Sequence, residues 1–148
     1  MEKSKDSQMK LQQGWIELLS AQQWTFFITL TTEYRLTINA ARNAVERFFA
    51  KIKWKGVERM FWVAEPFQAK DGYHIHLLVQ STPQLQAKYI FESWQIASGG
   101  KRLSLNNRVD IKEFDPLKGA SHYVAKHIQS KYSDYDIYDS LNSTLWDK

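Results

Sequence analysis

The sequence predicts a single α+β domain built on an antiparallel sheet. Three observations support this: several short segments have strand composition, segments with helical periodicity separate them, and the turn signal Lys70-Asp71-Gly72 joins two strands directly. The length of 148 residues fits one domain, and a hydrophobic fraction of 43% is enough for a core. The order of the elements then decides the type of fold.

The predicted strands are rich in β-branched and aromatic residues or alternate between apolar and polar residues. They cover residues 24–32, 59–65, 73–80 and 107–114. Pro66 marks the end of the second strand, and the third begins straight after Gly72. These two strands should therefore form a hairpin with a loop longer than two residues.

The predicted helices are recognised by their apolar spacing and by capping residues. They cover residues 9–22, 37–54, 83–98 and 115–130. Thr37 can cap the second helix, Gly56 ends it, and Asp115-Pro116 is a typical helix start. Residues 131–148 show no clear period, and we expect them either to be loosely ordered or to pack their aromatic residues on the body.

Apart from the first helix, the order is βαββαβ followed by a final helix. This is the split βαβ arrangement of ferredoxin-like folds, with a central antiparallel sheet and helices mainly on one face. We expect residues 1–130 to form the domain, with 1–22 as an N-terminal helical extension. Residues 131–148 are expected to be an acidic, aromatic tail.

The composition favours an intracellular protein and permits a polyanionic partner, although each basic cluster could equally be a solvated helix face. The net charge is +4 with a sequence pI near 9.2, and the basic residues form two clusters. The first cluster holds Arg35, Arg42, Arg47, Lys51, Lys53, Lys55 and Arg59, and the second holds Lys101, Arg102 and Arg108. The absence of cysteine excludes disulfides and thiolate chemistry. There is no signal-peptide pattern and no membrane-spanning run, so we expect a cytoplasmic location, or a nuclear one in a eukaryotic host.

The strand 73–80 carries the clearest chemical signal. Side chains alternate between the faces of a strand, so His74 and His76 point the same way, about 7 Å apart. Neutral imidazoles are good ligands for a divalent cation, so the pair predicts a metal site. The alternative is that His74 and His76 are half-exposed strand residues with nothing bound.

A site for Mg²⁺ or Mn²⁺ needs a carboxylate as well, because these cations prefer oxygen ligands. If the hairpin turns around Ala69 or Lys70, Glu65 lies across from the histidine strand, near His74. A slip of one residue would place Glu65 on the wrong face, where it would be an ordinary surface carboxylate. Asp110, on the last predicted strand, is the reserve ligand.

The final predicted helix carries a second candidate set. Tyr123, Lys126 and His127 stand at helical spacing and share one face. A tyrosine hydroxyl can attack phosphorus when a metal polarises the phosphate, and a nearby lysine stabilises the charge that gathers there. The alternative is that Tyr123, with Val124 and Ile128, is the core stripe of an amphipathic helix.

Three motifs together resemble the HUH endonucleases, specifically the single-tyrosine replication initiators known as Rep proteins. Phe27-Ile-Thr-Leu-Thr31 resembles the first motif of that family. His74-Ile75-His76 matches the histidine–hydrophobic–histidine motif, and Tyr123-Val-Ala-Lys126 matches the Tyr-x-x-Lys motif. The motifs follow the family's order and span nearly the whole chain.

The resemblance implies a metal-dependent enzyme that nicks and joins single-stranded DNA at a replication origin or hairpin. Tyr123 would form a 5′-phosphotyrosine link, Lys126 would assist at the phosphate, and Glu65, His74 and His76 would bind Mg²⁺ or Mn²⁺. The basic clusters would hold the DNA backbone, and the DNA-binding candidates are Thr29, Thr31, Arg35, Lys101 and Arg102. Such an enzyme initiates rolling-circle replication of a plasmid or virus.

Two departures from the family pattern refine this expectation. No helicase segment follows the nuclease motifs, so we expect a separate helicase as a partner. His127 stands where two-tyrosine relatives place a second tyrosine, and Lys126 favours the replication branch over transposases. The alternatives are a transposase or relaxase of the same superfamily, or a non-catalytic module that binds single-stranded nucleic acid through exposed aromatic residues on its strands.

Overall fold

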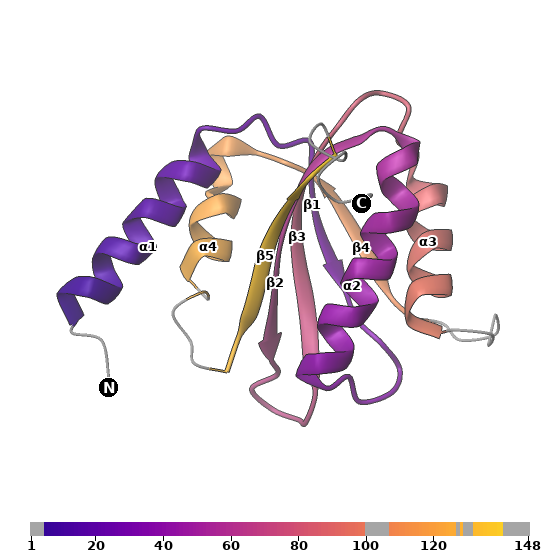
Figure 1. Cartoon of the computed structure of the whole chain (residues 1–148), viewed down its shortest axis with the longest axis horizontal. Helices are drawn as coiled ribbons and strands as arrows, with labels where there is room; N and C mark the ends of the chain where they lie inside the picture. Colours follow the sequence, from indigo (N-terminus) through magenta and orange to yellow (C-terminus); the bar gives the residue numbers. More distant parts are fainter. Residues whose placement is uncertain (1–4, 100–106, 127, 129–131, 141–148) are drawn as a thin grey trace, which may run out of the picture.

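The computed structural model describes residues 5–99, 107–126, 128 and 132–140 (Figure 1). Within these ranges the chain forms an α+β fold with helices on both sides of a twisted antiparallel sheet. In chain order the elements are α1 (Lys5–Ser20), β1 (Phe26–Leu30), α2 (Ile38–Ile52), the 3₁₀ helix η1 (Lys53–Lys55), β2 (Val57–Pro66), β3 (Tyr73–Ser81), α3 (Ala87–Gly99), β4 (Val109–Glu113), the 3₁₀ helix η2 (Pro116–Lys118), α4 (Ala120–Lys126) and β5 (Asp134–Asp139).

The strand order β4-β1-β3-β2-β5 confirms the ferredoxin-like class. The first four strands have the antiparallel pairing expected from the βαββαβ pattern, and β5 extends the sheet beyond β2. The hairpin register is also as predicted, because Glu65 lies directly opposite His74. Thr37 caps α2 by accepting a hydrogen bond from the Ala40 amide at 3.2 Å.

The two crossover helices, α2 and α3, cover one face of the sheet, which we call the closed face. Ile75, Leu77 and Val79 of β3 point into this face, as the alternation of β3 predicts. They pack with the fully buried Phe48 of α2 and Trp94 of α3. The main core of the protein therefore lies between the sheet and these two helices.

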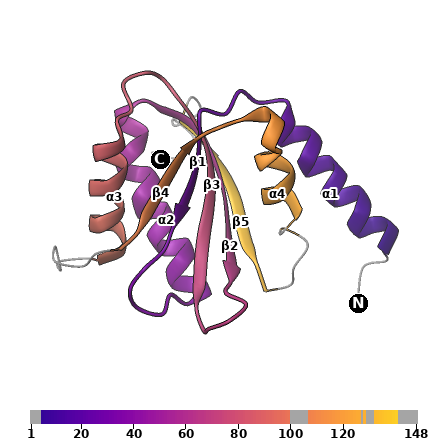
Figure 2. The same cartoon turned by 180° about the vertical axis from the view of Figure 1, so that it is seen from behind.

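The opposite face is covered by α1 and α4, which lie side by side away from α2 and α3 (Figures 1 and 2). The expectation that the helices lie mainly on one face therefore holds for α2 and α3 only. The reason is that β2 and β3 carry apolar residues on both faces: Phe61, Val63 and Leu78 point away from α2 and need a cover of their own. We call this second side the histidine face, because His74 and His76 share it with Leu78.

One other local prediction was wrong, and one open alternative is resolved. The predicted final helix, 115–130, is interrupted: η2 ends at Gly119, whose φ of 66° is left-handed, and α4 begins at Ala120. Of the two alternatives for the tail, the described part follows the second: β5 joins the sheet at residues 134–139, and Tyr138 is buried in the core. Arg42 of α2 secures this strand by donating two hydrogen bonds to the Asp134 carboxylate, at 2.7 and 2.8 Å.

Across the described ranges, no helix combines the length and the apolar character that crossing a membrane requires.

Candidate metal centre

The β2–β3 hairpin brings three potential metal ligands together on the histidine face. Glu65 is near the end of β2, and His74 and His76 are near the start of β3. A short loop closes the hairpin, in which the Phe67 amide donates to the Gly72 carbonyl at 3.0 Å and Gly72 has a φ of 105°. Only glycine adopts such a φ readily, so the Asp71-Gly72 signal in the sequence has a structural cause.

One carboxylate oxygen holds both imidazoles. Oε1 of Glu65 lies 2.9 Å from Nε2 of His74 and 2.9 Å from Nε2 of His76. One potential ligand atom from each residue lies within 4.8 Å of the other two, so a small movement would let all three contact one ion. Glu65 and His76 are each 7% exposed, and His74 is half-buried. The three residues could therefore hold a metal ion.

The side chains around the cluster fix the two rings. The Thr29 hydroxyl lies 3.2 Å from Nδ1 of His76, on the side of the ring away from Glu65. Phe27 stacks on His76 with ring centroids 5.7 Å apart, and Phe67 packs on His74 at 4.5 Å. A second hydrogen bond of this kind orients a ligating histidine and selects its tautomer. Thr29, predicted to contact DNA, is therefore placed to support His76.

The reserve ligand, Asp110, lies outside the cluster. Thr29 pairs with His76 on one side and with Asp110 on the other, so Asp110 is on the histidine face but two strands away from β3. Its side chain is 61% exposed and lies 3.7 Å from Lys112. Of the two carboxylates that the sequence offered, the structure places Glu65 with the histidines and leaves Asp110 at the sheet edge.

Helix α4, which carries the predicted nucleophile, packs on the histidine face. Val124 and Ala125 are buried in the same cluster as Val63, and Val63 lies directly opposite His76 in the sheet. Tyr123 and Lys126 belong to this helix, but their side chains lie outside what the structure describes. The backbone therefore brings α4 and the histidines to one side of the sheet.

A shallow hollow of about 380 Å³ adjoins the cluster through Phe67. Its lining includes Phe67 and Lys70 of the hairpin loop, to which the sequence analysis gave no binding role. The full set is Thr31, Thr32, Glu33, Phe67, Lys70 and Arg108. The ammonium group of Lys70 lies 4.4 Å from the Phe67 ring centroid. The sequence signal for this hollow was the presence of an aromatic residue, Phe67, and a lysine, Lys70, in the loop between Glu65 and His74.

The remaining DNA-binding candidates have different outcomes. Thr31 lines the hollow, and its amide donates to the Arg108 carbonyl at 3.0 Å. Arg35 is exposed and lies 3.9 Å from Asp71 of the hairpin loop. Lys101 and Arg102 lie outside the described residues.

Comparison with known proteins does not place the chain in a family. No family model, no curated protein and no solved structure matches it.

Proposed function

We propose that this protein nicks and joins single-stranded DNA as a metal-dependent strand-transfer enzyme of the HUH type. The observation that carries the proposal is the buried Glu65–His74–His76 cluster on the sheet face that α4 covers. A cluster of two histidines and a carboxylate is an unusual group to bury, because polar side chains lose hydration unless they gain partners or a ligand. Metal binding explains why all three are turned toward one point.

The donor set favours Mn²⁺ over Mg²⁺. Two of the three donors are imidazole nitrogens, whereas Mg²⁺ strongly prefers oxygen. When bound, the ion would polarise a phosphate oxygen and stabilise the negative charge that gathers during phosphoryl transfer.

The reaction needs a nucleophile, and our candidate is Tyr123 of α4, the helix on the same face of the sheet as the cluster. Its hydroxyl oxygen would form a bond to phosphorus as the bond from phosphorus to the 3′-oxygen breaks, and the phenolic proton would pass to that oxygen. The products are a 5′-phosphotyrosine link and a free 3′-hydroxyl. Because one ester replaces another, the reverse reaction rejoins the strand without ATP. Lys126 would contribute positive charge at the phosphate.

The hollow beside the cluster would hold the strand next to the reacting phosphate. Lys70 and Arg108 supply positive charge, and Phe67 supplies an aromatic surface within contact of His74. Phosphates bind to such cations, and unpaired bases stack on aromatic rings. A replication origin in single-stranded or hairpin form is therefore our proposed substrate.

A trapped adduct would test the proposal directly. The protein is incubated with Mn²⁺ and a pool of single strands that carry randomised hairpin loops and a label at the 3′ end. The downstream fragment stays on the tyrosine, so a labelled protein band should appear on a denaturing gel. Tyr123→Phe should abolish this band, and a chelator should abolish it in the unaltered protein.

The matched control is Tyr132→Phe, which makes the same chemical change at an exposed tyrosine. It should leave the adduct yield unchanged. An adduct that persists in Tyr123→Phe would move the nucleophile to another residue. Absence of any adduct across the pool, with DNA bound and Mn²⁺ loaded, would contradict the nicking activity while leaving the metal site intact.

A further inference from the structure

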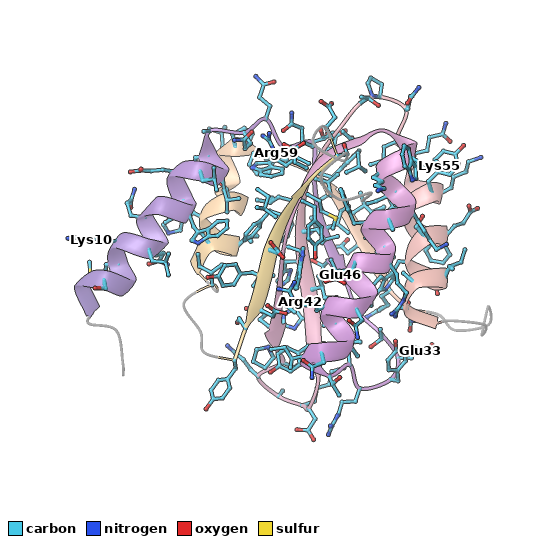
Figure 3. All side chains as sticks on the ribbon, in the orientation of Figure 1. Lys10, Glu33, Arg42, Glu46, Lys55 and Arg59 are labelled. Carbon is cyan, nitrogen blue, oxygen red and sulfur yellow. The ribbon has the colours of Figure 1, made fainter. Side chains whose placement is uncertain are left out.

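The first basic cluster of the sequence separates into two groups in the structure. Three of its arginines are engaged by the fold: Arg42 binds Asp134, Arg47 donates to the Ala97 carbonyl at 2.8 Å, and Arg59 lies 3.0 Å from Asp139. Lys55, which follows α2, is exposed instead at the corner where η1 turns into β2. Figure 3 shows Lys55 at this corner, on the opposite side of the molecule from Lys10 of α1.

A tight backbone turn brings this corner against the start of α3. Gly56 has a φ of 104°, and a Cβ atom there would lie 2.5 Å from the Thr82 hydroxyl. The Thr82 amide also donates to the Gly56 carbonyl at 2.8 Å. Residues 51–56 and 82–91 therefore form one surface, which we call the lysine corner. These two segments contain four lysines and no acidic residue.

Two lysines of the corner converge on one aromatic ring. The ammonium groups of Lys55 and Lys88 lie 4.7 and 5.2 Å from the ring centroid of Tyr89. Neither forms an ion pair with a carboxylate among the described residues. Like charges held near one ring repel each other, and an anion placed between them removes that cost.

The first turn of α3 adds to the positive potential. A helix N-terminus carries partial positive charge and normally favours acidic residues in its first turn. The first turn of α3 has none and carries Lys88 instead. This placement lowers the stability of the helix, so an anionic partner is the simplest reason for a lysine at this position.

Trp54 makes the lysine corner selective for an anion that carries an unpaired base. Its side chain is 70% exposed, an unusual state for the largest aromatic residue. Lys53 lies over one part of the ring, 5.0 Å from the centroid. An exposed indole among lysines offers stacking to a base and charge to the neighbouring phosphates, which is how proteins hold unpaired strands without sequence preference.

We infer that the lysine corner is a second binding site for single-stranded nucleic acid, separate from the metal centre. Val57 pairs with Ser81 at this end of the β2–β3 hairpin, whereas Glu65 pairs with His74 at the other. The rise along a strand puts the two ends roughly 25 Å apart. The inference does not depend on the nicking chemistry, because stacking and phosphate contacts need neither metal nor nucleophile.

The test measures binding of a fluorescent oligothymidylate of about 12 nucleotides by anisotropy, in buffer with chelator. Trp54→Ala should weaken binding at least about 5-fold, because one base–aromatic stack is lost. Trp54→Phe should retain most of the affinity. Met9→Ala on α1 is the matched control, since Met9 is also an exposed apolar side chain at 66%.

The contribution of the lysine charges to binding is measured separately, from the salt dependence of the affinity. The combined change Lys55→Gln and Lys88→Gln should reduce the slope of log K against log salt by about 1.4, the value for two phosphate contacts on a single strand. Lys10→Gln, an exposed lysine on α1, should leave the slope unchanged. All three positions are at the surface, so circular dichroism should show folded variants.

Cross-linking locates the strand independently of affinity. An oligonucleotide that carries 5-bromodeoxyuridine should cross-link on irradiation to peptides that contain Trp54 or Tyr89. Cross-links confined to the histidine face would overturn the inference, as would an unchanged dissociation constant in Trp54→Ala. Equal affinity for a duplex, insensitive to Trp54, would also overturn it, because a duplex offers no unpaired base to stack.

Discussion

The two faces of the sheet use the same strands for different purposes. The closed face holds the larger apolar core and packs Phe48, Trp62 and Trp94 with no exposure to solvent. The histidine face begins in the same way under α1 and α4, but toward the β2–β3 loop its apolar residues give way to Glu65 and His76. The contrast teaches that the main core and the candidate metal centre lie on opposite sides of the sheet, so substitutions should separate stability from metal affinity.

The largest expected effect is on the closed face. Phe48→Ala removes a fully buried ring that meets Trp94 edge-on at 5.9 Å, so it should lower the free energy of unfolding by about 3–5 kcal/mol. Urea unfolding monitored by circular dichroism would measure the loss. The Mn²⁺ affinity of the remaining folded protein should be unchanged. A large loss of Mn²⁺ affinity would show that the two faces are not independent.

The next effect is on the histidine face. Glu65→Gln keeps the shape of the side chain but removes its charge, so Mn²⁺ affinity measured by calorimetry should fall at least about 100-fold. Stability without metal should change little, because the glutamine amide oxygen can still accept hydrogen bonds from the imidazoles. Asp110→Asn makes the same chemical change at an exposed site and should have no effect. The reverse pattern would make Asp110 the ligand.

A smaller effect is expected from the residue behind His76. Thr29→Val keeps the size of the side chain but removes the hydroxyl beside Nδ1, so Mn²⁺ affinity should fall about 10-fold. Thr29→Ser should restore it, because serine keeps the hydroxyl. If Thr29→Val instead weakens DNA binding and leaves Mn²⁺ affinity unchanged, Thr29 contacts the strand rather than supporting the ligand.

The smallest effect at neutral pH concerns Tyr138 of β5, on the closed face. Burial raises the pKa of Tyr138 to about 12. In the unfolded chain Tyr138 ionises near pH 10. The stability that its neutral phenol contributes to the fold is therefore intact below pH 10 and is lost as the pH rises toward 12. The loss should reach about 2–3 kcal/mol in unfolding experiments at increasing pH. Tyr138→Phe should reduce this loss of unfolding free energy between pH 10 and pH 12, whereas Tyr132→Phe, at an exposed tyrosine, should leave it unchanged.

The sequence was sufficient for the hairpin and for the placement of its three potential ligands because the necessary information is local. Alternation along residues 73–80 put both histidines on one side, and the turn signal before Tyr73 set the register that brought Glu65 opposite His74. The ferredoxin-like strand order followed from the sequence of elements, since short connections leave few possible arrangements.

The parts that the sequence did not predict depend on partners far along the chain. The strand β5 alternates, but one side of it carries Asp134 and Asp136, which look like solvent residues until Arg42 of α2 is placed beside them. The role of Thr29 depends on a pairing between β1 and β3 that no local signal specifies. Helix α1 is likewise far in sequence from the strands β2 and β3, so no local signal indicated that it would cover the histidine face.

The hairpin that carries Glu65, His74 and His76 has a consequence for how the protein could change over time. All three side chains come from one stretch, 65–76, so assembling them requires closing only a short loop. Lengthening a loop raises its closure entropy only logarithmically, so the connection at 67–72 could gain residues at little thermodynamic cost. Grafting a different loop at this position would therefore change the groups that lie near the imidazoles, while Glu65, His74 and His76 stay in place.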